Sequence, residues 1–537
     1  MRRVFASLLA GVLLNPGMIY ASPGGYSPTA TPIKHIVVIF QENVSFDHYF
    51  GTYPNALNLK GEPPFHPAPG TPSVNGYGAA LLTHNPNLNP ANKTGATNPF
   101  RLSPSQASTA DQDHDYTPEQ QAFDGGVMDL FPEFTGAGGT AAGGTGSPAI
   151  FNTTGLAMGY YDGNTVTGMW NYAQHFAMND NSYGSNFGPS TPGALNLASG
   201  QTNGAIDNVN GTGSLVEDGN GGYTVNSDSD PAGDVCSTST GEKFSMSGKN
   251  IGDLLNAAGV SWGFFEGGFD LTVTNSNGTT GCKRSTTSAI TTITKVDYIP
   301  HHQPFQYYAS TANPTHIRPA SIAEIGNQGP ANHQYDTHDF FDAVSKGNFP
   351  AVSFLKAPGY QDGHAGYSDP IDEQTFIVNT INFLEKTPEW QNTAVIIAYD
   401  DSDGWYDHQM GPLVNQSQTP ADALNGTGFC GQSATNILPG VTAASAQGRC
   451  GYGPRLPFMV ISPYARPNFV DHTTTDQSSI IRFIEDNWLG GERIGNGSFD
   501  SIAGIITNMF DFNHCREEDG ILILNPTTGE VVASHGW

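Results

Sequence analysis

The sequence predicts an α/β fold: a mostly parallel central sheet with helices on both faces and long Gly/Asn-rich insertions. Short, fully apolar runs rich in β-branched residues are typical of strands buried on both faces of a parallel sheet. Two of the strongest are Ile33–Phe40 (IKHIVVIF) and Thr393–Tyr399 (TAVIIAY). Segments with a helical period lie between such runs, and strands that alternate with helices indicate a parallel sheet covered on both sides.

The remaining elements follow from the same patterns. A helix is expected over Asn250–Ala258, and a longer one over Ile371–Thr387, where apolar residues form one helical stripe. Pro388 would end the second helix, because proline cannot continue the hydrogen-bond ladder. Three more strands are expected, at Trp262–Glu266, Ala351–Leu355 and Leu456–Ile461.

We expect one large domain over 22–537 rather than the three or four domains that length alone suggests. The strong strands lie far apart in the chain, and no linker divides them into independent groups. Two Gly/Asn/Ser/Thr-rich stretches, near 136–155 and 200–241, are interpreted as long surface insertions.

Residues 1–21 have the pattern of a secretory signal peptide. Two arginines precede the apolar run Val4–Leu14, and Ala21 stands before a Ser-Pro-Gly-Gly tract. The alternative is an N-terminal helix buried in the fold, which Pro16 would interrupt. The apolar run is too short to span a bilayer, which takes about 20 residues. We therefore expect an exported protein, periplasmic or secreted, without integral membrane association.

The charge limits the possible partners. The chain has 21 Lys and Arg against 49 Asp and Glu, for a formal net charge of −28. Such a surface repels nucleic acid and anionic membranes, because both bind through basic groups that release counterions. No nucleic-acid partner is expected, and an anionic substrate must be attracted locally by a metal ion or a few cations. The charge does not indicate an oligomeric state.

The five cysteines form no CxxC pair, so a thiolate zinc site is not expected. In an exported protein, Cys236–Cys282 and Cys430–Cys450 are candidates for local disulfides, with Cys515 left over. Other pairings stay open, because even four cysteines allow three connectivities.

Polar oxygen ligands follow two of the predicted strands. Glu42 and Asn43 stand directly after the first strand, and Asp400 and Asp401 follow the strand TAVIIAY. Ligands of open α/β sheets gather at the carboxyl ends of strands, and adjacent buried carboxylates are costly unless a cation offsets their repulsion. The alternatives are a helix N-cap pair for the first and a solvated acidic turn for the second. Together the two strand ends favour a site for a hard divalent cation.

A candidate nucleophile stands in the turn Phe187-Gly-Pro-Ser-Thr-Pro-Gly, after which a helix is expected from about Pro192. Ser190 would lie at the N-terminus of that helix, where amide donors and the helix dipole favour a phosphoryl group. Metal coordination would lower the pKa of its hydroxyl enough for attack on phosphorus. The alternative is that Ser190 or Thr191 only caps the helix.

Four histidine contexts lie beside turn residues, where exposure or a site is more expected than a packed core. Imidazolium groups bind phosphate oxygens and protonate a leaving alkoxide near neutral pH. Any single histidine is still more often structural than catalytic. The contexts are Asp113-His114-Asp115, His301-His302, Asp362-Gly363-His364 and Asp407-His408.

Six stretches of the sequence, and their order along the chain, resemble the bacterial acid phosphatase and phospholipase C family of the alkaline phosphatase superfamily. They span nearly the whole chain after the signal peptide, with the insertions as gaps. The resemblance implies an alkaline-phosphatase-like sheet and an exported hydrolase that acts on phosphoric ester bonds. The stretches are IKHIVVIFQENVSFDHYFG, NFGPSTPGALNLASG, HHQPFQYYAST, FLKAPGYQDGHAGYSDP, IIAYDDSDGWYDHQ and GPRLPFMVISPYARP.

By this resemblance, Glu42, Asn43, Asp400, Asp401 and the hydroxyl of Ser190 would hold one divalent metal ion. Ser190 would be the nucleophile and would form a phospho-serine that water hydrolyses. The identity of the metal stays open: this oxygen-rich set suits Ca, Mg or Mn and would also accept Fe or Zn.

The resemblance also places four side chains around the phosphate as donors or proton shuttles: His114, Asp129, His302 and His364. His302 is preferred over His301 because family members more often keep the histidine just before x-Pro-Phe.

The choice of ester depends on local motifs. The GPSTPGALNL form, with serine as nucleophile, resembles the acid phosphatase branch, whereas phospholipase C members tend to carry threonine and Asn-Pro there. Val44 replaces an arginine common after Glu-Asn in the family, which would change substrate contacts. A phosphomonoesterase is favoured, and a phospholipase C acting on head groups such as phosphorylcholine is the alternative. A catalytically silent exported binding protein would have lost the nucleophile or the ligands, which this chain keeps.

Overall fold

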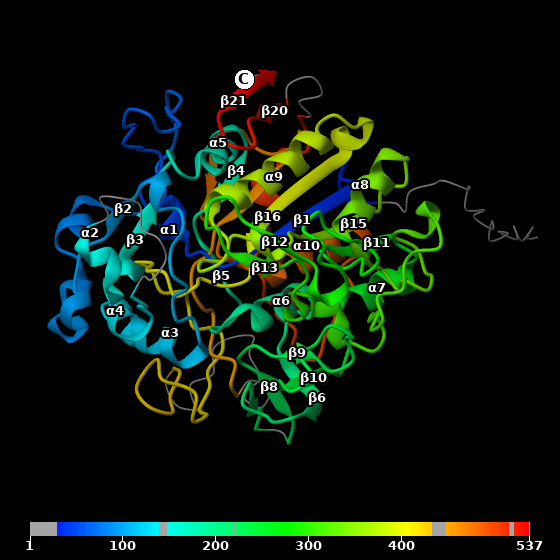
Figure 1. Ribbon diagram of the computed structural model, residues 1–537, viewed down its shortest axis with the longest axis horizontal. Helices are drawn as coiled ribbons and strands as arrows, with labels where there is room; N and C mark the ends of the chain where they lie inside the picture. The colour runs from blue at the N-terminus through cyan, green and yellow to red at the C-terminus, as the bar shows by residue number, and fades with distance from the viewer. Residues whose placement is uncertain (1–28, 139–147, 220, 432–446, 515–519, 536–537) are drawn as a thin grey trace, which may run out of the picture.

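The computed structural model describes residues 29–138, 148–219, 221–431, 447–514 and 520–535 (Figure 1). The predicted signal peptide and Cys515 lie outside these ranges, as does part of the first predicted insertion. At the centre is an eight-stranded sheet in the order β14-β11-β15-β1-β16-β17-β4-β18. In that order the strands are Gln334–Asp336, Trp262–Glu266, Val352–Lys356, His35–Gln41, Thr393–Tyr399, Phe458–Ile461, Ala177–Asn179 and Phe469–Asp471.

The central sheet is mostly parallel, as predicted. Every strand except β17 runs in one direction, and β17 pairs antiparallel with both β16 and β4. The two predicted central strands, β1 and β16, are buried along their whole length and pair with each other. The predictions at Trp262–Glu266 and Thr393–Tyr399 match β11 and β16 residue for residue. The segment Leu456–Ile461 becomes a strand only from Phe458 onward.

Helices cover both faces of this sheet. α9 contacts α5, and α6 contacts both α7 and α10, while Figure 1 shows α9 and α6 on opposite sides of β1 and β16. α8 packs on the sheet edge against β11 and β14. The bounds are Thr167–His175 (α5), Ser190–Ser199 (α6), Ile251–Ala258 (α7), Thr337–Ser345 (α8), Pro370–Leu384 (α9) and Ser478–Trp488 (α10).

The two helices predicted from periodicity are confirmed as α7 and α9. The Asn250 side chain caps α7 by accepting hydrogen bonds from two backbone N–H groups of the first turn. Asp369 caps α9 in the same way, and Pro370 occupies its first position, where proline loses no helical hydrogen bond. α9 ends at Leu384, four residues before the proline expected to stop it.

Short elements surround this core. Figure 1 shows α1 to α4, with the strand pair β2 and β3, grouped beside one end of the sheet. Their bounds are Phe46–Phe50, Ala79–Thr83, Tyr116–Phe123, Phe131–Phe134, Phe100–Leu102 and Gly159–Tyr161. Three further two-stranded pairs are Ser182–Tyr183 with Thr475–Asp476 (β5, β19), Ser285–Thr287 with Thr294–Val296 (β12, β13), and Ile521–Leu524 with Val531–His535 (β20, β21).

The second predicted insertion has a sheet of its own, in the order β7-β8-β6-β10-β9. Its strands are Leu215–Glu217, Tyr223–Val225, Asn203–Val209, Lys243–Met246 and Asp230–Pro231. Both predicted disulfides are confirmed: Cys236–Cys282 ties this insertion to the segment after β11, and Cys430–Cys450 closes a separate loop. Among the described residues, no helix combines the length and the apolar character that a bilayer span needs.

Candidate active site

The carboxyl ends of β1 and β16 bring the predicted ligands together. The two strands pair in parallel with Gln41 opposite Tyr399, so Glu42 and Asp400 leave the sheet side by side. Asn43 follows with a φ of 36°, a left-handed conformation that asparagine tolerates better than most residues. The register of two buried strands therefore delivers the polar cluster that the sequence places at each strand end.

Ser190 reaches this cluster from the other side, at the first residue of α6. Its hydroxyl lies 2.9 Å from Glu42 Oε2 and 3.1 Å from Asp401 Oδ2, and the residue is buried. α6 comes this close because Gly193 faces the backbone of Asp400, where a Cβ would clash. The helix begins at Ser190, two residues earlier than the Pro192 that the sequence suggests.

The residues in this cluster fit a divalent metal ion. Glu42, Asp400 and Asp401 are each 2% exposed or less. The side-chain oxygen Asn43 Oδ1 is buried and accepts no hydrogen bond from any described residue. Three carboxylates, one amide oxygen and one hydroxyl form the donor set that hard cations prefer. The buried, unpaired amide oxygen is the feature that a metal ligand would explain.

The pKa values of the carboxyl groups point the same way. Burial raises the pKa of Asp400 well above its usual range, and the nearby Glu42 carboxylate adds to the effect. Burial also raises the pKa of Asp401 to about 7, although His114 opposes the shift. Acids with such shifts do not ionise together without a compensating cation. A divalent ion would supply that compensation.

Lys356 is a member of the cluster that the sequence reasoning did not single out. It is the last residue of β15, the neighbour of β1 on the side away from β16. Its ammonium contacts Glu42 Oε1 and lies 3.2 Å from Asp400 Oδ2. The available signal was a lysine directly after the predicted strand Ala351–Leu355, where a charged side chain must have a buried partner.

Of the two adjacent histidines, His302 is the one that lies against the cluster. Its Nδ1 is 3.3 Å from Glu42 Oε1, and burial lowers its pKa well below the usual value. His301 faces the insertion instead, with Nδ1 3.5 Å from Asp230 and Nε2 3.9 Å from Asp228. The preference for His302 agrees with this geometry.

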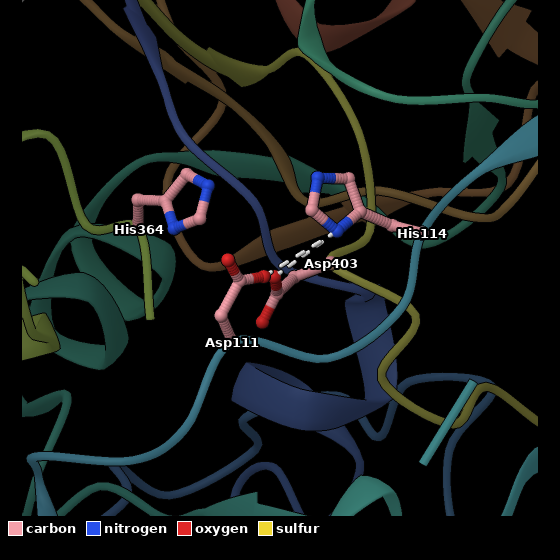
Figure 2. Close-up of side chains that lie close together, drawn as sticks. All are labelled: Asp111, His114, His364 and Asp403. Atoms are coloured by element: carbon pink, nitrogen blue, oxygen red, sulfur yellow. Dashed lines mark ion pairs between the residues drawn. The ribbon is translucent and has the colours of Figure 1, made fainter. Parts of the chain in front are cut away.

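His114 and His364 form a second layer beside the cluster, with two carboxylates that the sequence reasoning missed (Figure 2). His114 Nε2 lies 3.4 Å from the amide nitrogen of Asn43. Its Nδ1 lies 2.8 Å from the Gln112 carbonyl oxygen, 3.4 Å from Asp403 and 3.6 Å from Asp111. The sequence signal for these carboxylates was spacing alone: Asp111 is three residues before His114, and Asp403 is two residues after Asp401.

This arrangement holds His114 in one orientation. An Nδ1–H donated to a carbonyl oxygen leaves Nε2 directed at the Asn43 side of the site. Burial by itself lowers the pKa of His114, but Asp401, Asp403 and Asp111 together raise it well above the usual value. The ring of His364 is edge-on to that of His114 at 5.8 Å, and burial lowers the pKa of His364. The pKa values of the two imidazoles are thus shifted in opposite directions.

Asp129 is the predicted site residue that the structure places elsewhere. Its Oδ2 accepts a hydrogen bond from Asn89 at 2.7 Å, and its backbone oxygen accepts one from Asn92 at 2.8 Å. Asn92 lies in the 3-10 helix Pro90–Gly95, and Asn89 is the N-cap residue of that helix. Within the described part of the chain, no hydrogen bond or ion pair joins Asp129 to Ser190 or to the carboxylates around it.

Two other clusters of acids and histidines lack the character of a ligand site. In one, Asp234 and His316 lie beside Cys236, but that cysteine is bonded to Cys282 and has no free thiolate. In the other, Asp47, Asp407 and His408 surround the guanidinium of Arg455.

Comparisons with known proteins identify the family of the chain. A sequence model of the phosphoesterase family matches residues 33–489. A non-hemolytic phospholipase C of Pseudomonas aeruginosa is 24% identical over 503 residues, which cover 90% of this chain and 58% of that protein. Phospholipase C A of Mycobacterium tuberculosis is 25% identical over 508 residues, 90% of this chain and 78% of that protein. The chain therefore spans little more than half of the Pseudomonas relative.

Similarity to solved structures is much weaker. A protein in the alkaline phosphatase superfamily from Vibrio parahaemolyticus matches 60% of each chain with 10% identity and a TM-score of 0.26. A phosphonate monoester hydrolase from Silicibacter pomeroyi matches 61% of this chain and 69% of its own, with 12% identity and the same TM-score. These matches are too weak to add to the assignment.

Proposed function

The chain belongs to the phosphoesterase family, and we propose that it is an exported, metal-dependent hydrolase of phosphoric esters with Ser190 as its nucleophile. One observation carries the proposal: the buried Ser190 hydroxyl lies within hydrogen-bond distance of both Glu42 and Asp401. A serine held against two carboxylates at the meeting point of two parallel strands is suited to attack an electrophile beside a bound cation.

In the proposed reaction, Ser190 Oγ attacks the phosphorus atom and the bond from phosphorus to the leaving oxygen breaks. The hydroxyl donates to Glu42 or Asp401, so these carboxylates orient it for the attack, and one of them takes its proton as the bond to phosphorus forms. A divalent ion held by Glu42, Asn43, Asp400, Asp401 and Ser190 would lower the pKa of the hydroxyl and offset the charge of the phosphoryl group. Water then cleaves the phospho-serine and restores the hydroxyl.

The histidines supply the protons and donors of the proposal. The raised pKa of His114 makes its imidazolium a donor to a phosphoryl oxygen and a source of the proton that the leaving alkoxide takes up. His302 and His364, whose pKa values are lowered, are neutral and can accept a proton from the attacking water. The part of Asp129 in the reaction stays a prediction from the resemblance.

Two substrate classes remain candidates for this one site. The serine motif favours a phosphomonoester, as in acid phosphatases. The relatives named phospholipase C favour a phosphodiester such as a phosphorylcholine head group. Either way the substrate is a phosphate ester that meets a strongly acidic chain, so we propose no nucleic-acid partner.

We further propose that the protein acts outside the cytoplasm, in the periplasm or as a secreted enzyme. Its two disulfides fit an oxidising compartment, since cytosolic thiols are kept reduced. The signal-peptide pattern of residues 1–21 supports the same location.

The test compares initial rates on p-nitrophenyl phosphate and p-nitrophenylphosphorylcholine, each with and without a chelator. Chelator-sensitive hydrolysis of at least one ester is expected. A faster monoester reaction supports an acid phosphatase, and a faster phosphorylcholine reaction supports a phospholipase C. Hydrolysis of neither ester by the metal-loaded protein would contradict the proposed function.

A further inference from the structure

The charge of Lys356 is almost completely removed from water. The residue is 1% exposed at the end of β15, and its ammonium lies 5.6 Å from the centre of the Phe40 ring. Its other partners are Glu42 and Asp400. A buried ammonium persists only where carboxylates and geometry hold it in place, so this lysine is a fixed component of the cluster.

The oxygens of the cluster divide between two sides. Glu42 Oε2 and Asp401 Oδ2 face the hydroxyl of Ser190. Glu42 Oε1 and Asp400 Oδ2 face the ammonium of Lys356. Glu42 thus bridges a hydroxyl side and an ammonium side.

A charge count explains why both sides are needed. Glu42, Asp400 and Asp401 carry three negative charges when ionised, and a single divalent ion leaves one of them uncompensated. Lys356 supplies the missing positive charge. The other cationic group beside the cluster, His114, has two carboxylates of its own, Asp403 at 3.4 Å and Asp111 at 3.6 Å. The nearby Asp362 has donors of its own, the hydroxyl of Tyr367 and the N–H of His364. Burial of an uncompensated charge costs several kcal/mol, which makes this balance a strong constraint.

We infer that Lys356 is a positioning residue that acts as a fixed internal cation: it occupies the side of Glu42 and Asp400 where a second metal ion would otherwise bind. The site then takes one divalent ion, on the Ser190 side. The inference deepens the proposed function and rests on the metal site proposed there. It assigns Lys356 to the organisation of the ligands rather than to the substrate.

The test is a double-mutant cycle on metal binding, with Mn²⁺ as the probe, which separates the coupling of two positions from their individual effects. The bound Mn²⁺ per chain and its Kd are measured for the metal-free full chain and its variants. The wild type is expected to bind one ion. Asp400→Asn leaves the positive charge of Lys356 uncompensated. It should weaken Mn²⁺ binding about tenfold or more, since an attraction of about 1.4 kcal/mol between carboxylate and metal ion is lost.

The double variant Lys356→Ala/Asp400→Asn is neutral again with one divalent ion, so it should bind Mn²⁺ about tenfold more tightly than Asp400→Asn does. Its affinity should stay below that of the wild type, because the ligand oxygen of Asp400 is still missing. Lys356→Ala alone should take up a second, weaker Mn²⁺ in the vacated space. Lys346→Ala is the matched control, because it is the same substitution at an exposed lysine just after α8. It should change neither the number of bound Mn²⁺ ions nor their Kd.

Two results would overturn the inference: a double variant that binds no better than Asp400→Asn, or a folded Lys356→Ala that binds one ion with unchanged Kd. If Lys356→Ala does not fold, the comparison of Asp400→Asn with the double variant still tests the role of Lys356. Metal counts do not depend on turnover. A wild type that binds one Mn²⁺ but hydrolyses no ester contradicts the proposed function and leaves the role of Lys356 standing.

Discussion

Two buried groups of acids follow β1 and β16, and they differ in how their charge is compensated. The site cluster consists of Glu42, Asp400, Asp401 and Lys356: three carboxylates and one ammonium. The arginine cluster consists of Asp47, Asp407, Arg455 and His408. The carboxylates of both clusters are almost fully shielded from water and come from the segments that follow the same two strands. The two main cations come from elsewhere: Lys356 ends β15, and Arg455 precedes β17.

The arginine cluster is complete within the protein. Arg455 lies 2.9 Å from Asp47 and 3.1 Å from Asp407, and the Asp47 carboxylate raises the pKa of His408 against the effect of burial. Each carboxylate of this cluster thus has a cationic partner. The site cluster has one ammonium for three carboxylates, so it is two positive charges short, and its Asn43 amide oxygen has no partner among the described residues. A deficit of positive charge in a well-ordered buried cluster therefore distinguishes a ligand site from a structural ion-pair network.

The largest expected effect is on the rate of ester hydrolysis at the site cluster. Ser190→Ala removes the nucleophile and should lower kcat by about 10,000-fold or more, because residual catalysis then depends on binding alone. Initial rates on the better of the two p-nitrophenyl substrates measure it. Ser199→Ala, the same change at the other end of α6, should leave kcat within about threefold, since Ser199 bonds only Leu195, Gln201 and Tyr308. Undiminished hydrolysis by Ser190→Ala would contradict the proposed mechanism.

The largest expected effect on stability is in the arginine cluster. Arg455→Met leaves Asp47 and Asp407 without their guanidinium, and removal of one partner from a buried ion pair costs about 3–5 kcal/mol. The free energy of unfolding from urea denaturation should fall by that amount, while the number of bound Mn²⁺ ions should not change. A variant as stable as the wild type would show that the cluster adds nothing to the fold.

A matched pair of substitutions then contrasts the two clusters directly. Asp401→Asn should weaken Mn²⁺ binding about 100-fold, equivalent to about 2.7 kcal/mol, and lower the rate with it. Asp407→Asn is the same change six residues later, and it should reduce stability without altering the Kd for Mn²⁺. Isothermal titration and urea denaturation on both variants provide the comparison. Unchanged Mn²⁺ binding by Asp401→Asn would show that this carboxylate has a structural role and is not a metal ligand.

The last prediction concerns Glu385, a buried carboxyl that forms no ion pair among the described residues. Burial raises the pKa of Glu385 to about 8, and its Oε1 accepts only the N–H of Leu522. The folded state thus holds a proton that the unfolded state releases above its ordinary pKa of about 4.3. The stability that this proton contributes is complete below that value and is lost as pH rises toward 8, by at most about 1.4 kcal/mol per pH unit.

Glu385→Gln keeps the acceptor for Leu522 and removes the titration. The stability of this variant relative to the wild type should therefore rise steadily from pH 5 to pH 8. Other titrating groups cancel in this difference. Urea denaturation of both proteins across the pH range measures it, and a difference that stays constant with pH would contradict the raised pKa of Glu385.

The helices and strands that the sequence predicts are those with long, uniform patterns of apolar residues. β1, β11 and β16, and the helices α7 and α9, follow from apolar runs and helical periods that tertiary contacts reinforce. β4, β14 and β18 have three residues each, too few to carry a pattern. The direction of β17 also escaped prediction, because a strand's apolar residues do not record which way its neighbour runs.

The predicted part of the site depends on one rule, that polar residues directly after buried strands meet at a common edge. It brought Glu42, Asn43, Asp400 and Asp401 together, and the turn before α6 added Ser190. Lys356 obeys the same rule, because it directly follows the predicted strand Ala351–Leu355, but it was not singled out. Asp129 was included by resemblance alone, and the structure places it beside Asn89.

The sequence by itself predicted the α/β class and the central strands, and it offered both disulfides and the site residues as candidates, since each leaves a local pattern of apolar runs, spacing or residue type. Only the tertiary structure decided which charges compensate one another. Arg455 meets Asp47 across more than 400 residues, and Lys356 meets Glu42 across more than 300. Compensation is a property of distance in space, so no local pattern separates a structural ion pair from a site that still needs its metal.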